Sequence, residues 1–290
     1  MGKKLSVFDK RQTMGGADFE IQHKRDTVLK DVELHHHDFY EIYYLVSGDV
    51  TYVIEGKLCR IMPGDLLLVS PRELHQVTIG AGSAPYERYV LWVEADFVRR
   101  LSTEKSDLEA GLNPLRPGHT NILRLSPEQQ IVVRNLMETI FTESESDNFG
   151  SDLLMQNLVA QLLVQINRLA EHSGSEEYFV YANPLVSELV DYVNRHYREK
   201  LTLDDLAERF FVSKYHLSHE FQKHMGVGIY RYIQKKRLQI AKALLIRGES
   251  PSNIPGLCGF GDYPGFYRAF TAEYGVAPKA FAQSARWHSD

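Results

Sequence analysis

The chain contains only two cysteines, Cys59 and Cys258, at widely separated positions. Two isolated thiols provide neither a disulfide framework nor the four ligands of a zinc ribbon. The chain also lacks any run of about 18 consecutive apolar residues, the length that a membrane helix requires, and its first ten residues lack the apolar core of a signal peptide. These absences exclude disulfide-rich and membrane-spanning classes, and we expect a cytoplasmic protein that has no membrane partner.

An overall excess of positive charge is lacking too, with 33 Lys and Arg against 38 Asp and Glu in 290 residues. The distribution is uneven, because residues 184–290 hold 15 basic and 11 acidic residues, which leaves 18 basic and 27 acidic residues in 1–183. A locally basic region favours polyanions, whereas an acidic one repels them. Since the length is about twice that of a usual single domain, we expect two domains with different partners.

Short strands separated by turns are predicted from residue 27 to about residue 93. Segments such as EIYYLVSG and YVLWVE are rich in β-branched and aromatic residues, and glycine or proline follows most of them. This spacing, about ten residues per strand and turn, is typical of an all-β barrel or sandwich. We assign residues 1–125 to this domain.

Residues 126–172 have a helical pattern. Ser126, Pro127 and Gln129 form a strong helix start, with a cap, a first-turn proline and a reciprocal capping partner. Further along, apolar residues recur at helical spacing to make one stripe, consisting of Leu154, Leu158, Leu162, Ile166 and Leu169. The stripe fits either packing on the β domain or a dimer seam, and one helix could do both. We assign 126–172 to a helical dimerisation segment and the polar residues 173–183 to a linker.

The last hundred residues contain two related helical units. In the first, Thr202 and Ser213 cap two short helices that are joined by a tight turn, which is typical of a helix-turn-helix. The second helix has an apolar inner side and a basic, hydroxylated and aromatic outer side. A longer helix, 228–248, follows, and residues 250–281 repeat the plan. The basic side of the long helix favours phosphate contact and comprises Arg231, Lys235, Lys236, Arg237 and Lys242.

These two units, together with the segments RLQIAKALL, GF…FYRAF and YGVAP…F, resemble the double helix-turn-helix domain of the AraC/XylS family of bacterial transcription regulators. The resemblance covers about residues 184–286 without a gap and implies an all-α DNA-binding domain at 184–290. It also implies promoter DNA and RNA polymerase as partners, and a homodimer. The residues that it places on DNA are Ser213, Lys214, Tyr215, Ser218, His219 and Lys223 in the first unit, and Tyr263, Tyr267 and Arg268 in the second. Arg268 is the best candidate for reading a guanine edge, because a guanidinium bridges O6 and N7.

Three positions depart from the family pattern. Pro255 stands where a regular helix usually continues, so the first helix of the second unit is short or kinked unless Pro255 falls in its first turn. Gly265 gives its recognition helix no side chain for a base, and Phe211 occupies a position where the family often has glycine. We therefore expect the first unit to be the stronger sequence reader.

The stretch HHHDFYEIYYLVSG, which begins at His35, carries the clearest candidate site in the N-terminal half. In a strand, His35, His37 and Glu41 share one face with Tyr43, and His36 points to the other. The pattern H-x-H-x3-E-x6-G resembles the first motif of the cupin barrel, and an N-terminal cupin-like effector domain is common in the AraC/XylS family. The match to the second cupin motif is partial: Gly64 and His75 fit, while Ser70 and Arg72 replace its usual Pro and Gly.

Three interpretations of this cluster remain open. Three imidazoles and a carboxylate could bind a divalent metal through His35, His37, Glu41 and His75. The same groups could instead hydrogen-bond a small polar effector, possibly a sugar, with Tyr43, Tyr52 or Trp92 as an aromatic wall. They could also satisfy one another without a ligand.

Fusion to a DNA reader argues against catalysis, since a sensor must hold its ligand and not convert it. We therefore predict a DNA-binding transcription regulator with no catalytic residues and no required cofactor. The alternative is a metal-dependent cupin enzyme with a helical appendage. The predicted effector-binding residues are His35, His37, Glu41, Tyr43, His75 and Trp92.

Overall fold

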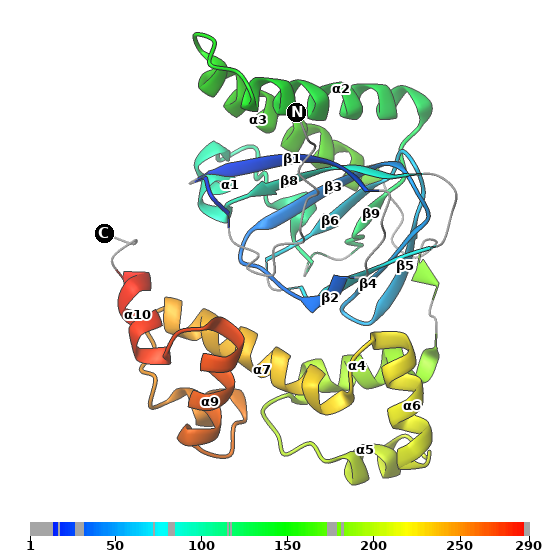
Figure 1. Ribbon diagram of the computed structural model, residues 1–290, viewed down its shortest axis with the longest axis vertical. Coiled ribbons are helices and arrows are strands. Elements are labelled where there is room, and N and C mark those ends of the chain that lie inside the picture. Colours follow the sequence, from blue (N-terminus) through cyan, green and yellow to red (C-terminus); the bar gives the residue numbers. More distant parts are fainter. Residues whose placement is uncertain are drawn as a thin grey trace. The chain divides into compact units, whose positions relative to one another are not determined.

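The structure, a computed structural model, describes residues 14–16, 18–26, 32–71, 73–80, 85–114, 116, 118–172, 179–180 and 183–286. The chain divides into two compact units, Met1–Val180 and Tyr181–Asp290 (Figure 1). Among the helices in these ranges, none has the length and apolar character needed to cross a membrane.

The first unit is built on two five-stranded antiparallel sheets. One sheet has the order β1(Phe19–Asp26), β8(Tyr86–Val93), β3(Tyr40–Ser47), β6(Leu66–Val69), β9(Ile122–Leu123). The other has the order β10(Phe179–Val180), β5(Lys57–Ile61), β4(Val50–Ile54), β7(His75–Ile79), β2(Val32–His35). The predicted all-β character of this region is confirmed.

Strand β3 is buried on both of its faces. Tyr43 and Leu45 pack into an inner core between the two sheets, where Tyr52 of β4 joins them. Ile42 and Tyr44 point to the opposite side, into an outer core that the helices cover. The alternation of side chains along a strand therefore assigns each residue of β3 to one of two apolar layers.

Helices cover the outer side of the β1–β8–β3 sheet (Figure 1). They are α1(Ala95–Leu101), the 3-10 helix η1(Ala110–Leu112), α2(Pro127–Ser144) and α3(Ser151–His172). The predicted capping box is present, because Ser126 accepts from the backbone N–H of Gln129 and the Gln129 side chain accepts from that of Ser126. Along α3 the predicted stripe packs on the outer core from residue 158 onward, whereas Leu154 is exposed. Packing on the β domain is thus confirmed for this segment.

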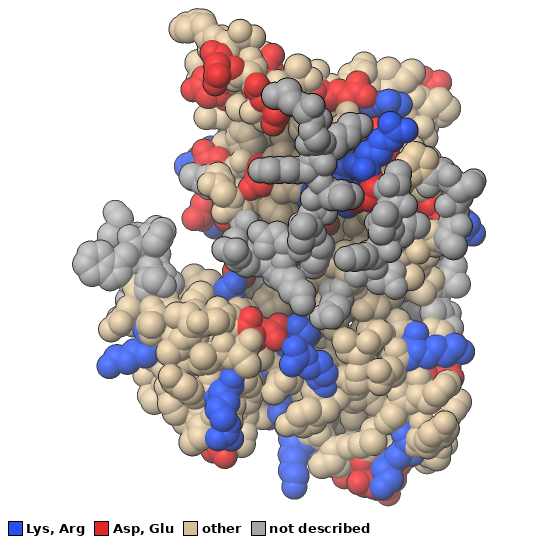
Figure 2. All heavy atoms as spheres, viewed as in Figure 1, with Lys and Arg blue, Asp and Glu red and all other residues tan. Residues whose placement is uncertain are grey.

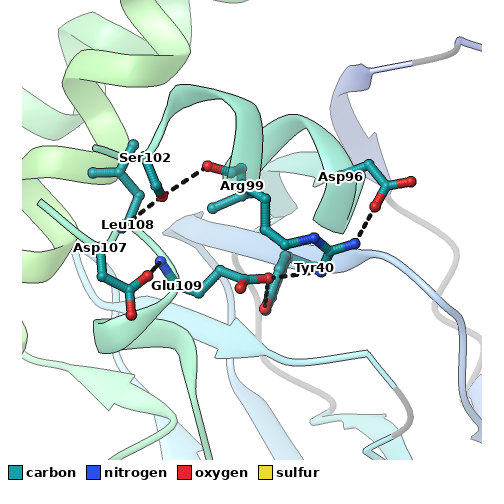
Figure 3. A network of polar contacts seen from close by, with 8 residues as sticks. Tyr40, Asp96, Arg99, Ser102, Asp107, Leu108 and Glu109 are labelled. Carbon is teal, nitrogen blue, oxygen red and sulfur yellow. Dashed lines mark hydrogen bonds and ion pairs between the residues drawn. The ribbon is translucent and has the colours of Figure 1, made fainter. Parts of the chain in front are cut away.

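A polar network fastens α1 and η1 to the edge of this outer core (Figure 3). The hydroxyl of Tyr40 donates to Glu109 at 3.1 Å, and the Arg99 guanidinium donates to the same carboxylate at 3.2 Å. Burial, with Glu109 beside it, raises the pKa of Tyr40 above its ordinary value. Tyr40 lies on the opposite face of β3 from Glu41, so the network supports the fold and is separate from the inner face.

Most of the predicted linker, residues 173–178 and 181–182, lies outside the described residues. Its described part has secondary structure. Phe179 and Val180 form β10, which pairs with Cys59 and Leu58 of β5. Asn183 caps the next helix by accepting from the N–H of Leu185, and its side-chain amide donates to Glu220 at 2.7 Å.

The second unit is helical, as predicted. Its helices are α4(Pro184–His196), α5(Leu203–Arg209), α6(Lys214–Met225), α7(Ile229–Ile246), α8(Ile254–Cys258), α9(Tyr263–Tyr274) and α10(Pro278–Arg286). The long helix α7 runs between the two helix-turn-helix units (Figure 1). A compact core joins its second half to α8, α9 and α10 through residues such as Leu238, Leu245, Phe266 and Phe270.

The departures from the family pattern each have a structural counterpart. Pro255 lies in the first turn of α8, and that helix is also short, with only five residues. Asp262 caps α9 by accepting from the N–H of Gly265 at 2.6 Å, so the proline in its first turn is tolerated. Phe211 adopts a left-handed backbone conformation with φ of 54°.

Candidate functional sites

A buried group of polar side chains lies on the inner side of the β1–β8–β3 sheet. Glu41 comes from β3, His37 from the segment just before it, and His75 from the start of β7. One ligand atom from each lies within 4.8 Å of the others. Their residues are only 7%, 2% and 1% exposed, respectively. The structure therefore brings together three of the four predicted metal ligands.

The two imidazoles are oriented in the same way. In each ring Nδ1 lies 2.8 Å from a backbone carbonyl oxygen, that of Phe39 for His37 and that of Glu73 for His75. A carbonyl accepts, so Nδ1 carries the proton and Nε2 is left with a lone pair. Neither Nε2 makes a hydrogen bond with a residue that the structure describes, although that of His37 lies 3.6 Å from Oε2 of Glu41. Buried polar atoms in proteins are nearly always paired, so these two nitrogens are available to a ligand.

Glu41 is held in its ionised form. Burial opposes the charge, but the nearby imidazoles of His37, whose Nε2 lies 3.6 Å from Oε2, and His75, together with the indole N–H of Trp92, outweigh it and hold the pKa of Glu41 below its usual range. The indole donates to Oε2 at 2.9 Å. Burial, with His35 and His37 nearby, holds the pKa of His75 well below its ordinary value. At neutral pH the site therefore presents a carboxylate beside a neutral imidazole.

The remaining predicted effector residues lie around this group. The ring of His35 is 4.2 Å from that of His75, but His35 is not among the three residues whose ligand atoms converge. Tyr43 and Trp92 both lie on the inner face, and the Tyr43 hydroxyl donates to that of Tyr86 at 3.0 Å. Tyr43 is only 1% exposed.

A row of polar residues on β1 was not among the predicted site residues. The pairing of β1 with β8 sets Glu20 opposite Trp92 and Lys24 opposite Arg88. Opposite residues in an antiparallel pair share a face, so these side chains lie on the same inner face as Glu41. The signal was the alternation in FEIQHKRD, where every second residue from Glu20 onward is polar.

On the second unit, α6 presents the first predicted DNA-reading surface. Its inner residues Leu217, Phe221 and Met225 are buried, as expected. Its free side has a shallow hollow lined by Tyr215, Ser218, His219, Gln222 and Lys223. Ser213 caps the helix and Lys214 pairs with Asp204 at 2.7 Å, so these two residues shape the start of the helix.

The second predicted reading surface is the free side of α9. Tyr263 and Tyr267 are about 40% exposed, while Phe266 is buried beneath them. Arg268 is exposed and makes no ion pair with any residue in the described ranges. Its guanidinium is therefore free to contact a nucleic acid.

The basic side of α7, for which we expect phosphate contact, is partly occupied by contacts within the unit. The Lys235 ammonium lies 2.5 Å from the carboxylate of Glu273, and Arg231 contacts the same carboxylate at 3.4 Å. Arg237 donates to the backbone carbonyls of Tyr197 and Glu199, both at 2.8 Å. These three side chains hold α7 against the rest of the unit. Sequence periodicity places a basic residue on one side of a helix, but it does not show whether that residue is bonded within the protein.

The charges differ between the units on the face that Figure 2 shows. Lys and Arg side chains are spread over the helical unit, whereas Asp and Glu gather over α2 and α3 of the first unit. This distribution agrees with the charge asymmetry of the sequence.

A β domain with a buried polar group, joined to two helix-turn-helix units, defines a two-domain DNA-binding regulator. The family model described as an AraC-like ligand binding domain matches residues 17–163, half of the chain, and one described as a helix-turn-helix domain matches 206–284. The chain therefore belongs to the AraC-type family of transcription regulators. This assignment also favours a regulator over the alternative of a cupin enzyme.

Proteins of similar sequence are named as helix-turn-helix transcription regulators. An uncharacterised helix-turn-helix transcriptional regulator of Staphylococcus aureus strain COL is 28% identical over 150 residues, which are 51% of this chain but only 20% of that protein. The transcriptional activator RhaS of Escherichia fergusonii is 28% identical over 188 residues, 63% of this chain and 66% of its own. The chain thus spans about a fifth of the length of the first of these relatives.

Among solved structures, wild-type ToxT of Vibrio cholerae is 13% identical. The match covers 93% of this chain and 96% of ToxT, with a TM-score of 0.41.

Proposed function

We propose that the protein binds promoter DNA through α6 and α9 and responds to a small polar effector held between the two sheets. The observation that carries the effector site is the pair of buried Nε2 atoms of His37 and His75, neither with a hydrogen bond among the described residues, beside the carboxylate of Glu41. All three groups are hydrogen-bond acceptors. A hydroxyl-rich molecule such as a sugar supplies matching donors, and Trp92 offers an aromatic wall.

A divalent metal ion is a second candidate for the same three residues. Metal-bound histidines usually donate their other ring N–H to a carbonyl or carboxylate, and both His37 and His75 have that arrangement. Two imidazole nitrogens and a carboxylate suit zinc, iron, manganese or nickel. A metal bound here would supply a fixed positive charge, and His37, Glu41 and His75 would hold it.

Thermal unfolding of the full chain tests both candidates. Sugars, organic acids and divalent metals are added singly, and a ligand present at 100 times its dissociation constant adds about 2.7 kcal/mol of stability. We expect His37→Ala to abolish the stabilisation and His36→Ala, a matched imidazole on the other side of the segment, to keep it. The reverse result would contradict the assignment, and a metal assay near one equivalent would favour the metal.

The DNA-binding part of the proposal rests on the exposed side chains of α6 and α9, of which His219 and Lys223 also contact Glu220 at 3.3 and 4.0 Å. Binding to promoter DNA should weaken steeply with salt, and Lys223→Ala should lower the log-log slope by about one if Lys223 contacts a phosphate. His219→Ala and Arg268→Ala are then compared across operator variants. We expect His219→Ala to change base preference more, and a change confined to Arg268→Ala would reverse our ranking of the two units.

We also propose a homodimer with RNA polymerase as a further partner at the promoter. Exposed apolar residues lie at the two ends of the α2–α3 hairpin, namely Ile131 and Val132 near the start of α2 and Leu153 and Leu154 near the start of α3. In a dimer with a two-fold axis across the hairpin, Ile131 and Val132 of one copy contact Leu153 and Leu154 of the other copy.

A further inference from the structure

The carboxylate of Glu220 lies on helix α6 between two pairs of contacts. Oε2 accepts from the side-chain amide of Asn183 at 2.7 Å and lies 3.4 Å from Nε2 of His224. Oε1 lies 3.3 Å from Nδ1 of His219 and 4.0 Å from Nζ of Lys223. The Glu220 side chain is 15% exposed, against 58% for that of His219. Glu220 therefore connects the cap of α4 with two residues that line the hollow on the free side of α6.

Asn183 holds this carboxylate in place. Its side-chain oxygen accepts from the N–H of Leu185 as the cap of α4, and its side-chain nitrogen donates to Glu220. Burial opposes the charge of Glu220, but the hydrogen bonds from Asn183 and His219 lower the pKa of that carboxyl. Glu220 is thus an ionised carboxylate, which accepts hydrogen bonds and has none to donate.

The contact with Glu220 decides which nitrogen of His219 carries the proton. A carboxylate only accepts, so Nδ1 of His219 donates. A neutral imidazole carries one proton, so the other nitrogen, Nε2, then has a lone pair. The ring also lies nearly parallel to that of Tyr215, with centroids 6.1 Å apart and 18° between the planes, which gives its orientation a second support. The neutral His219 ring thus offers an acceptor at the hollow of α6.

An acceptor in the major groove distinguishes two of the four bases from the other two. Cytosine presents its N4 amino group there and adenine its N6 amino group, and both donate. Guanine O6 and thymine O4 accept instead. A nitrogen with a lone pair accepts from an amino group and repels a carbonyl oxygen. The position of the proton on His219 therefore selects between cytosine or adenine and guanine or thymine.

We propose that Glu220 is a positioning residue for DNA reading, which holds the proton of His219 on Nδ1 so that Nε2 accepts from the amino group of cytosine or adenine. This inference rests on the proposed function, in which His219 contacts a base. Asn183 acts through Glu220, because its amide fixes the carboxylate from the side of α4. Neither Asn183 nor Glu220 touches a base in this role.

The position of the proton can be measured without DNA. The full chain is labelled with ¹⁵N in histidine and studied by long-range proton–nitrogen spectra at about pH 8, above the ordinary histidine pKa of about 6.5. The signals absent from His219→Ala identify His219, and we expect its proton on Nδ1. In Glu220→Gln the amide oxygen keeps the hydrogen bond from Asn183, and the amide nitrogen donates to His219. The proton should therefore move to Nε2 in that variant.

Base preference gives the second readout. At the operator position where His219→Ala removes discrimination, the wild type should prefer cytosine or adenine by about two- to tenfold, the scale of one hydrogen bond. Glu220→Gln should shift that preference to guanine or thymine. Glu208→Gln is the matched control, because it removes the same charge from an exposed residue of α5 and should keep the wild-type preference.

The outcomes distinguish this inference from the proposed function. A wild-type ring with its proton on Nε2, or the same tautomer in a folded Glu220→Gln, would overturn the positioning role. A wild-type preference for guanine or thymine would overturn the reading of an amino group. If His219→Ala changes no base preference while the chain still binds promoter DNA, the inference fails and the proposed DNA binding stands. A full chain that binds no promoter DNA would overturn the proposed function and the base reading with it.

Discussion

Phe211 has a left-handed backbone conformation, which is unfavourable for a residue with a large side chain. It follows α5 with φ of 54°, and its side chain is 96% exposed, so no packing compensates for the strain. We predict that Phe211→Gly raises the free energy of unfolding by about 1 kcal/mol, because glycine adopts the left-handed conformation without a Cβ clash. Urea unfolding measures the change. Phe211→Ala is the control, and an equal gain from it would attribute the effect to the exposed ring.

His119 should make stability depend on pH in a defined window. Burial, and next the charge of Lys57, lower the pKa of His119 from 6.5 to about 4. Between these values the unfolded chain binds a proton that the folded chain does not, so stability falls as the pH falls. We predict that His119→Leu loses less unfolding free energy than the wild type between pH 7 and 4.5, by up to about 3 kcal/mol. Parallel pH profiles of the two proteins would contradict this.

At the scale of single residues, the sequence predicted the faces of a strand better than the members of a site. Period-two alternation correctly set Glu41 and Tyr43 on the inner face, because that alternation is a property of the strand itself. Whether His35 belongs to the same ligand group as His37 depends on where β2 ends before β3 begins. Alternation along a strand does not show where the strand ends. The inner-face position of Lys24 was not predicted, because it depends on the pairing of β1 with β8.

At the scale of elements, a buried ion pair links the long helix α7 to α9. The side chains of Lys235 and Glu273 are only 11% and 16% exposed. We predict that Glu273→Gln destabilises the protein by about 3 kcal/mol, because it leaves a buried ammonium without its counter-charge. Arg231→Gln should cost less than about 1 kcal/mol, since Arg231 is 55% exposed.

A double substitution checks the cause. Lys235→Met with Glu273→Leu removes both charges and should recover most of the stability lost in Glu273→Gln. If the double variant is no more stable than the single one, the contact acts through shape and not through charge. Urea unfolding of the four proteins gives the comparison.

Local signals predicted the starts of three helices, while pairing between distant segments was not predictable. The caps at Ser126, Thr202 and Ser213 are present, since a cap involves residues only a few positions apart. Strand β10 was assigned to a linker, because its two residues become a strand only through β5, more than a hundred positions earlier. The bracing of α7 was missed for the same reason.

At the scale of the whole molecule, composition and family resemblance predicted two units of different charge and different secondary structure. They did not reveal that β1 and β8 continue the polar face of β3. That continuity depends on how β1 and β3 each pair with β8. The acidic surface of the first unit also has a consequence for DNA. It repels phosphates, so sequence-independent binding should come from the helical unit.

Dimerisation is the prediction that belongs to the whole molecule. The exposed leucines 153 and 154 of α3 are expected to pack on Ile131 and Val132 of a second copy. We predict that Leu153→Glu with Leu154→Glu gives a monomer by sedimentation at concentrations where the wild type is a dimer, without lowering the unfolding temperature of the monomer. Met62→Glu is the matched control, because Met62 is similarly exposed, at 43%, but lies on a turn outside the hairpin.

DNA binding provides the second readout of the same variant. Two linked copies bind paired operator sites with an effective concentration in the millimolar range, so the monomer should lose about a hundredfold in affinity for a paired site. Its affinity for a single site should stay unchanged, because α6 and α9 are intact. A wild type that sediments as a monomer throughout, or a charged variant that still dimerises, would show that this hairpin is not the interface.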